Sequence, residues 1–130
     1  MIDLSNRKFK VWAYTVSHSF LILRSPLVFE DVEGYNESLD FNIDIEFTSV
    51  IYIDIPNILS GIRITEIKSD IPQKFCSYIK DPNNKLFEIE SNGSYFYIVA
   101  GGYLIGKNKW FSEDRISNMS LKYDEILASS

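Results

Sequence analysis

The sequence has little of the residue types on which many enzyme and metal sites depend. It contains one cysteine, Cys76, and one histidine, His18, among 130 residues. A lone thiol forms no intramolecular disulfide, and a structural zinc site needs several Cys and His ligands at close spacing. Nucleophilic catalysis of the Ser-His or Cys-His type would have to use His18, which lies between two serines in a turn-like segment. We therefore expect no catalytic residue, no metal and no other cofactor.

Long hydrophobic runs are also missing. No stretch approaches the roughly 20 apolar residues that span a bilayer. Residues 1–11 alternate charged and hydrophobic side chains, unlike the apolar run of a signal peptide. These features predict a cytoplasmic protein without a membrane partner. Apolar residues nevertheless make up 45% of the chain, which is enough to build the core of one β-rich domain over residues 1–130.

Basic residues are absent from one long segment that is rich in acids. Between Ser25 and Ile62 there is no Lys or Arg, and the eight acidic residues there are Glu30, Asp31, Glu33, Glu37, Asp40, Asp44, Glu46 and Asp54. The other ten acids and the thirteen basic residues nearly balance, so this segment produces the net charge of −5. Charge concentrated in this way indicates a surface for a basic partner and disfavours nucleic acid.

The clearest strand pattern runs over residues 41–55, where apolar side chains occupy nearly every odd position. Because side chains alternate between the two faces of a sheet, Asp44 and Glu46 are predicted to face solvent. The segment is longer than the usual strand of about five or six residues. We therefore predict a bulge or turn at Thr48 and Ser49 that divides it into two strands. Residues 30–40, which precede this pattern, are predicted to form an acidic loop.

A hairpin is predicted around Asn92 and Gly93. This dipeptide favours a type I′ turn because both central residues need positive φ. A two-residue loop there pairs Ser91 with Ser94 and fixes the register of both strands. After the second strand, the Gly101-Gly102 pair is predicted to bend the chain.

The remaining segments give weaker local patterns. In chain order we expect a hairpin from residues 9–16 and 20–24, a helical turn over residues 56–60, a strand over residues 62–67 and a helix from Ser112. Residues 69–80 fit either a short helix or a strand, and we favour a strand from Phe75. Together the patterns predict a mainly β fold, an antiparallel barrel or sandwich of about seven or eight strands with one or two short helices. An α+β arrangement is the alternative.

Several apolar segments of the chain resemble small bacterial proteins, some of them immunity-like proteins encoded beside polymorphic toxins. The segments are SHSFLILRS, NIDIEF, VIYIDIP, GIRI and YFYIVAGG. The resemblance implies an immunity-like binding role. It includes no catalytic motif and assigns no functional residue.

The leading hypothesis is a non-enzymatic protein-binding domain, such as an immunity-type inhibitor, that presents an acidic face to a basic protein such as a toxin. Tyrosine is enriched in interface hot spots, so we expect tyrosines near the acids to be exposed. The candidate partner-binding residues are Glu30, Asp31, Glu33, Asp44, Glu46, Tyr52, Asp54, Tyr95 and Tyr97.

Three alternatives remain open. A small-ligand-binding barrel would need an internal cavity, lined by Phe9, Phe47, Phe87 and Phe96. A carboxylate-dependent enzyme would use Asp44 or Glu46 with a second acid in a cleft. A homodimer through an exposed sheet edge is the third.

Overall fold

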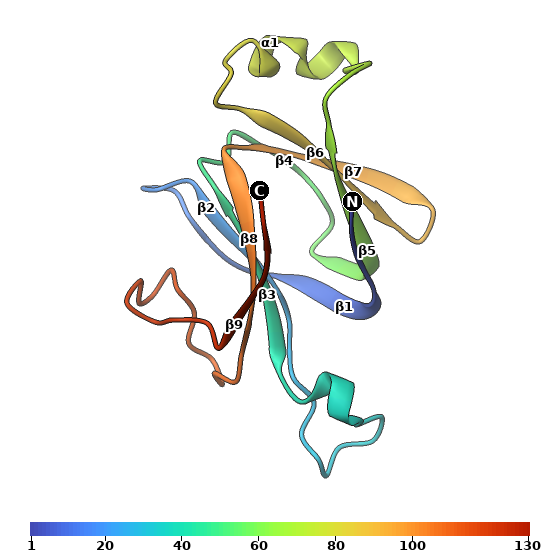
Figure 1. Cartoon of the computed structure of the whole chain (residues 1–130), viewed down its shortest axis with the longest axis vertical. Coiled ribbons are helices and arrows are strands. Elements are labelled where there is room, and N and C mark those ends of the chain that lie inside the picture. Colours follow the sequence, from blue (N-terminus) through green and yellow to red (C-terminus); the bar gives the residue numbers. More distant parts are fainter.

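Nine strands form one sheet in which every neighbouring pair is antiparallel (Figure 1). The computed structural model describes residues 1–130. The strands are β1 (Ile2–Thr15), β2 (Phe20–Ser25), β3 (Asn42–Thr48), β4 (Tyr52–Asp54), β5 (Ile58–Ile67), β6 (Lys85–Ser91), β7 (Ser94–Ala100), β8 (Gly102–Asn108) and β9 (Glu125–Ser129). Their order in the sheet is β4-β7-β6-β5-β1-β2-β3-β8-β9. The predicted mainly β class is confirmed, and the sheet is not closed into a barrel.

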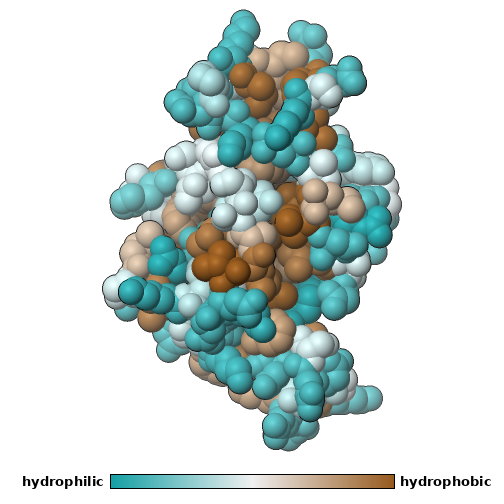
Figure 2. Space-filling model, viewed as in Figure 1, coloured by the Kyte–Doolittle hydropathy of each residue, from teal (hydrophilic) through white to brown (hydrophobic).

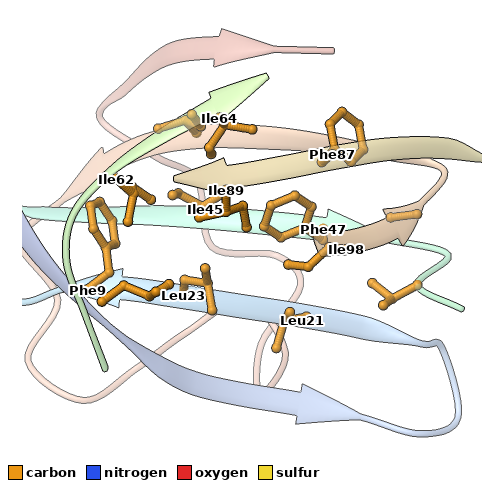
Figure 3. Packing of buried hydrophobic residues seen from close by; sticks show 14 of the residues in the cluster. Phe9, Leu21, Leu23, Ile45, Phe47, Ile62, Ile64, Phe87, Ile89 and Ile98 are labelled. Atoms are coloured by element: carbon orange, nitrogen blue, oxygen red, sulfur yellow. The ribbon is translucent and has the colours of Figure 1, made fainter. Parts of the chain in front are cut away.

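The sheet curls so that strands distant in its order face each other across one core (Figure 3). Phe47 on β3 and Phe87 on β6 are both fully buried, with ring centroids 5.8 Å apart. Ile45, Ile89 and Ile98 pack in the same cluster. Of the four residues predicted to line a cavity, only Phe9 borders a hollow, a depression at the surface, and no hollow reaches Phe47, Phe87 or Phe96. The internal cavity of a ligand-binding barrel is therefore absent, because aromatic and aliphatic side chains fill that space.

Two bends give the sheet its curled shape, and both were predicted. The chain leaves β3 through Ser49, whose φ is +51°, and enters β4 after a short connection. The amide of Gly101, between β7 and β8, donates to the carbonyl of Thr48 at 2.8 Å. Strand β3 pairs with β8 and β4 pairs with β7. The β3–β4 connection and the β7–β8 connection therefore lie side by side and bend at the same place.

The predicted hairpins are also confirmed. Asn92 and Gly93 have φ of +51° and +76°, and Ser91 pairs with Ser94 as the turn requires. Strands β1 and β2 form the expected hairpin in the N-terminal part. The helical turn predicted over residues 56–60 is wrong, because β5 already begins at Ile58.

Residues 73–79 are helical, so the strand predicted from Phe75 is wrong. They form a 3-10 turn, η2 (Gln73–Phe75), and the four-residue helix α1 (Cys76–Ile79). Phe75 is fully buried against the outer face of the sheet, with its ring centroid 5.2 Å from that of Tyr52 and 5.0 Å from that of Tyr97. Both tyrosines are consequently half-buried, contrary to their predicted exposure.

The helix predicted from Ser112 is not formed. Residues 109–124 are instead a covering loop of turns that leads into β9. The Asp114 carboxylate accepts hydrogen bonds from the amides of Ile116 and Ser117, at 2.9 and 2.8 Å. Such local bonds offer the backbone an alternative to a helix. No helix of the structure has the length and apolar character needed to cross a membrane.

Candidate functional site

Seven of the eight acids between Ser25 and Ile62 fall into two groups in the structure. One group, Asp44 and Glu46, lies on β3 and is buried, with residue exposures of 0% and 2%. The other group lies on the acidic loop, residues 30–40, and is largely exposed. The prediction that Asp44 and Glu46 face solvent is therefore wrong, because the covering loop, residues 109–124, packs on that face of the sheet.

Asp44 forms a buried ion pair with Arg24 on the neighbouring strand β2. The guanidinium donates through Nε and one terminal nitrogen to the two carboxylate oxygens, at 2.6 and 2.8 Å. Asn108 donates a further hydrogen bond to Asp44 at 3.0 Å, and Arg24 stacks 4.6 Å from the centroid of the Trp12 ring. Such a two-pronged pair fixes both side chains.

Glu46 is held by two side chains of the covering loop. Its carboxylate accepts a hydrogen bond from the Tyr123 hydroxyl, and its Oε2 lies 2.8 Å from Arg115 Nε. Burial raises the pKa of Glu46 above its usual value, although the Tyr123 hydrogen bond and the Arg115 charge act in the opposite direction. The pKa of Tyr123 is raised as well, by burial and by the adjacent carboxylate. No hollow reaches Asp44 or Glu46, so the cleft needed for carboxylate catalysis is missing at this pair.

The acidic loop projects from one end of the molecule, at the bottom of Figure 1. Four of its five acids, Glu30, Asp31, Glu33 and Glu37, are exposed, and none of them forms an ion pair. The fifth, Asp40, is half-buried and lies 3.4 Å from Lys109. In Figure 2 this end of the molecule is mainly hydrophilic.

Arg7 anchors the base of the acidic loop. Its side chain is buried and donates to the carbonyls of Ser25, Ser38 and Phe41, at 3.0, 3.0 and 2.7 Å. Its Nε also donates to the Ser25 hydroxyl at 2.9 Å. Burial lowers the pKa of this guanidinium. One side chain from β1 thus ties both ends of the connection between β2 and β3.

Hydrogen bonds within the acidic loop add to this anchoring. The Val28 amide donates to the Leu39 carbonyl at 2.8 Å, which closes the stem. Asn36 caps the 3-10 helix η1 (Glu37–Leu39) by accepting from the Ser38 amide at 2.9 Å. A loop with its ends close together and its own internal bonds holds its side chains in a defined arrangement.

Exposed apolar side chains accompany the acids. Phe29 and Val32 on the loop are 53% and 49% exposed, and Phe111 on the covering loop is 77% exposed. The rings of Phe29 and Phe111 lie 6.4 Å apart and line a hollow of about 150 Å³. Charge counting alone does not find these residues. The motif that could have indicated them is an aromatic residue immediately before the acids, as in Phe29-Glu30.

The charges of the loop acids act on a tyrosine within the loop. Tyr35, half-buried within it, has a raised pKa, chiefly from partial burial and then from the nearby charges of Asp40, Glu30 and Glu37. Unpaired acids concentrated at one end of the molecule attract cationic groups and repel anionic ones.

The other predicted partner-binding residues lie elsewhere. Asp54 on β4 and Tyr95 on β7 are exposed, but these strands occupy the upper half of Figure 1, away from the acidic loop. His18 is exposed in the turn between β1 and β2, where its Nδ1 lies 2.9 Å from the Ser17 hydroxyl. No acid forms an ion pair with it, so the orienting group of a catalytic triad is missing.

Comparisons of the chain with protein-family models, curated proteins and solved structures found no match. The acidic loop is therefore identified as a candidate site by its own geometry alone.

Proposed function

We propose that the protein is a binding domain whose acidic loop docks against a basic surface of another protein. The observation that carries this proposal is an anchored loop whose free acids stand beside exposed aromatic rings. Charged side chains steer association, and large apolar side chains supply most of the contact energy in protein interfaces. The loop presents both, and Arg7 holds it in shape before binding, which lowers the entropic cost of association.

The partner that fits this surface is a basic protein, such as a toxin with a positively charged groove. A row of carboxylates attracts the same Lys and Arg side chains that bind phosphate. The resemblance of several segments to immunity-like proteins encoded beside toxins agrees with this partner. In this proposal the protein inhibits its partner by covering the groove and performs no chemistry itself.

The test is a pull-down from native lysate at low and at high salt. The test variant combines E30Q, D31N and E33Q, which removes three free charges and leaves the Arg7 anchor unchanged. The matched control combines D70N, D81N and D124N, three exposed acids outside the loop. We expect a basic partner that is retained at low salt, released at high salt, lost with the loop variant and kept by the control.

Two outcomes would contradict the proposal. If the loop variant and the control lose the same partner equally, net charge and not the loop governs binding. If all three proteins retain the same partners, the acidic loop has no binding role. F29S, which removes an exposed ring without changing charge, separates the two components, because it should weaken retention of the partner at low salt although every charge is kept.

A further inference from the structure

The largest hollow of the structure borders the stem of the acidic loop, and two lysines are among its lining residues. Its volume is about 430 Å³, within the range of small-molecule sites. Leu27, Val28, Leu39 and Ile58 contribute apolar walls, while Lys8 and Lys10 of β1 also line it. It is therefore a mainly apolar depression with two cationic side chains.

These lysines have no acidic partner. Neither Lys8 nor Lys10 takes part in any ion pair of the structure, although the chain contains 18 acids. They lie two positions apart on β1, so both side chains extend from the same face of the strand. Lys10 Nζ lies over the Trp12 ring, 5.4 Å from its centroid, a cation–π contact that leaves its formal charge without an acidic partner.

A third cation lies behind the hollow. The buried guanidinium of Arg7 bonds to Ser25, which is itself a lining residue. All of its hydrogen-bond acceptors are neutral oxygens. A buried cation without a carboxylate contributes a positive potential that solvent screens only partly. Two lysines without an acidic partner therefore line this mainly apolar hollow, and buried Arg7 lies behind its Ser25 wall, in a protein whose net charge is −5.

We propose that this hollow binds a free fatty acid. The alkyl chain would lie against Leu27, Leu39 and Ile58, and the carboxylate would meet Lys8 and Lys10. Charge complementarity selects this occupant over a neutral or cationic amphiphile, because no acid of the structure pairs with the lining lysines. The proposal does not rest on the proposed protein-binding function, because it uses Lys8 and Lys10 of β1, although Val28 and Leu39 of the hollow also close the stem of the acidic loop.

The test is an NMR titration of the ¹⁵N-labelled protein with three ligands of equal chain length: decanoate, decanol and decyltrimethylammonium, each below its micelle concentration. We expect saturable shifts of the amides of Lys8, Lys10, Val28 and Leu39 with decanoate. Two exposed ion pairs should make decanoate bind about tenfold tighter than decanol. The cationic ligand should bind more weakly than the alcohol.

Variants then locate the charge effect. K8Q/K10Q should reduce the affinity for decanoate to that for decanol and leave the decanol affinity unchanged. The control K68Q/K80Q, which neutralises two exposed lysines elsewhere, should bind all three ligands like the wild type. I58E, which places a carboxylate in the hollow, should reduce the affinity for decanoate more than the affinity for decanol. Equal affinities of the wild type for decanoate and decanol, shifts confined to other residues, or shifts that do not saturate would each overturn the proposal.

Discussion

The carboxylates of β3 and those of the acidic loop are close in the sequence but differ in burial and in ionic partners. Asp44 and Glu46 are buried and face Arg24 and Arg115. Glu30, Asp31 and Glu33 are exposed and have no ionic partner. Both groups belong to the same base-free segment, yet only the loop acids remain available to another molecule.

The difference arises from what covers each segment. Strand β3 lies between β2 and β8, so its outer face is accessible to side chains from both neighbours and from the covering loop. The acidic loop has its stem tied by Arg7, while its tip extends beyond the sheet (Figure 1). Acids on a covered face must be paired, because an isolated buried charge is very costly. Acids on a projecting loop need no partner within the chain.

The test with the largest expected effect on stability removes one buried acid. D44A leaves the Arg24 guanidinium buried without its carboxylate, which typically costs about 3–5 kcal/mol. Urea denaturation should therefore show a large loss in the free energy of unfolding. E33A on the loop is the control and should change it by less than about 0.5 kcal/mol. Similar losses in the two variants would mean that the buried pair is not a structural element.

The next test removes Arg7, which anchors the stem of the acidic loop next to β3. R7M keeps an apolar stem but leaves three carbonyls and one hydroxyl without their donor, at a cost of about 2–4 kcal/mol. Hydrogen exchange of the Val28 amide should accelerate, because its bond to Leu39 closes the loop stem. K8M, a change of the adjacent exposed cation, should leave that exchange rate unaltered. Unchanged protection in R7M would show that the loop holds its shape without Arg7.

A third test uses pH. The folded-state pKa of Glu46 is raised by burial, so the folded protein holds that proton more tightly than the unfolded chain does. This contribution to stability is fully present below the unfolded pKa and is lost as pH rises through the folded pKa. The variant E46Q lacks it. As pH rises from about 4 to about 7, the wild type should therefore lose stability relative to E46Q, so the free energy of unfolding of E46Q minus that of the wild type becomes more positive, measured by urea denaturation. E33Q, an exposed acid, should show no such trend, and a constant difference for E46Q would contradict the assignment.

Elements that depend on backbone conformation could be predicted from the sequence. The Asn92-Gly93 turn and the break at Gly101 rest on local preferences of glycine and asparagine, the bend at Ser49 rests on the limited length of strands, and each is present. The alternation of residues 41–55 identified the core face correctly only as far as the bend, where Ile43, Ile45 and Phe47 are all buried. Beyond it the prediction is wrong, because Ile51 and Ile53 are 48% and 42% exposed.

Contacts between distant segments could not be predicted in the same way. The burial of Asp44 depends on segments more than 60 residues away along the chain: Asn108 at the end of β8 donates to it, and Glu113 of the covering loop accepts from its partner Arg24. One sequence signal existed, namely Arg24 at the end of the apolar run from Phe20 to Leu23. An arginine in such a run must meet an acceptor if it is buried. The helical spacing after Ser112 was misleading, because side-chain bonds of Asp114 and Arg115 stabilise turns instead.

The candidate site could be found only in part. Counting charges located the acids of the loop, but not the anchor, since no local pattern distinguishes Arg7 from the neighbouring Lys8 and Lys10. The exposed rings of Phe29 and Phe111 come from segments 82 positions apart. Their proximity depends on the pairing of β3 with β8, which no local pattern specifies.

The smallest effect on stability is expected where the effect on binding is largest. The variant E30Q/D31N/E33Q removes charges that repel one another and have no partner in the chain. Its free energy of unfolding should equal that of the wild type within about 0.5 kcal/mol, or exceed it slightly at low salt. Thermal melts at two salt concentrations measure this, with D70N/D81N/D124N as the control of equal charge change. A clear loss of stability in the loop variant would mean that these acids hold the fold, as Asp44 does. Unchanged stability together with a lost partner would mean that the acids are retained for binding.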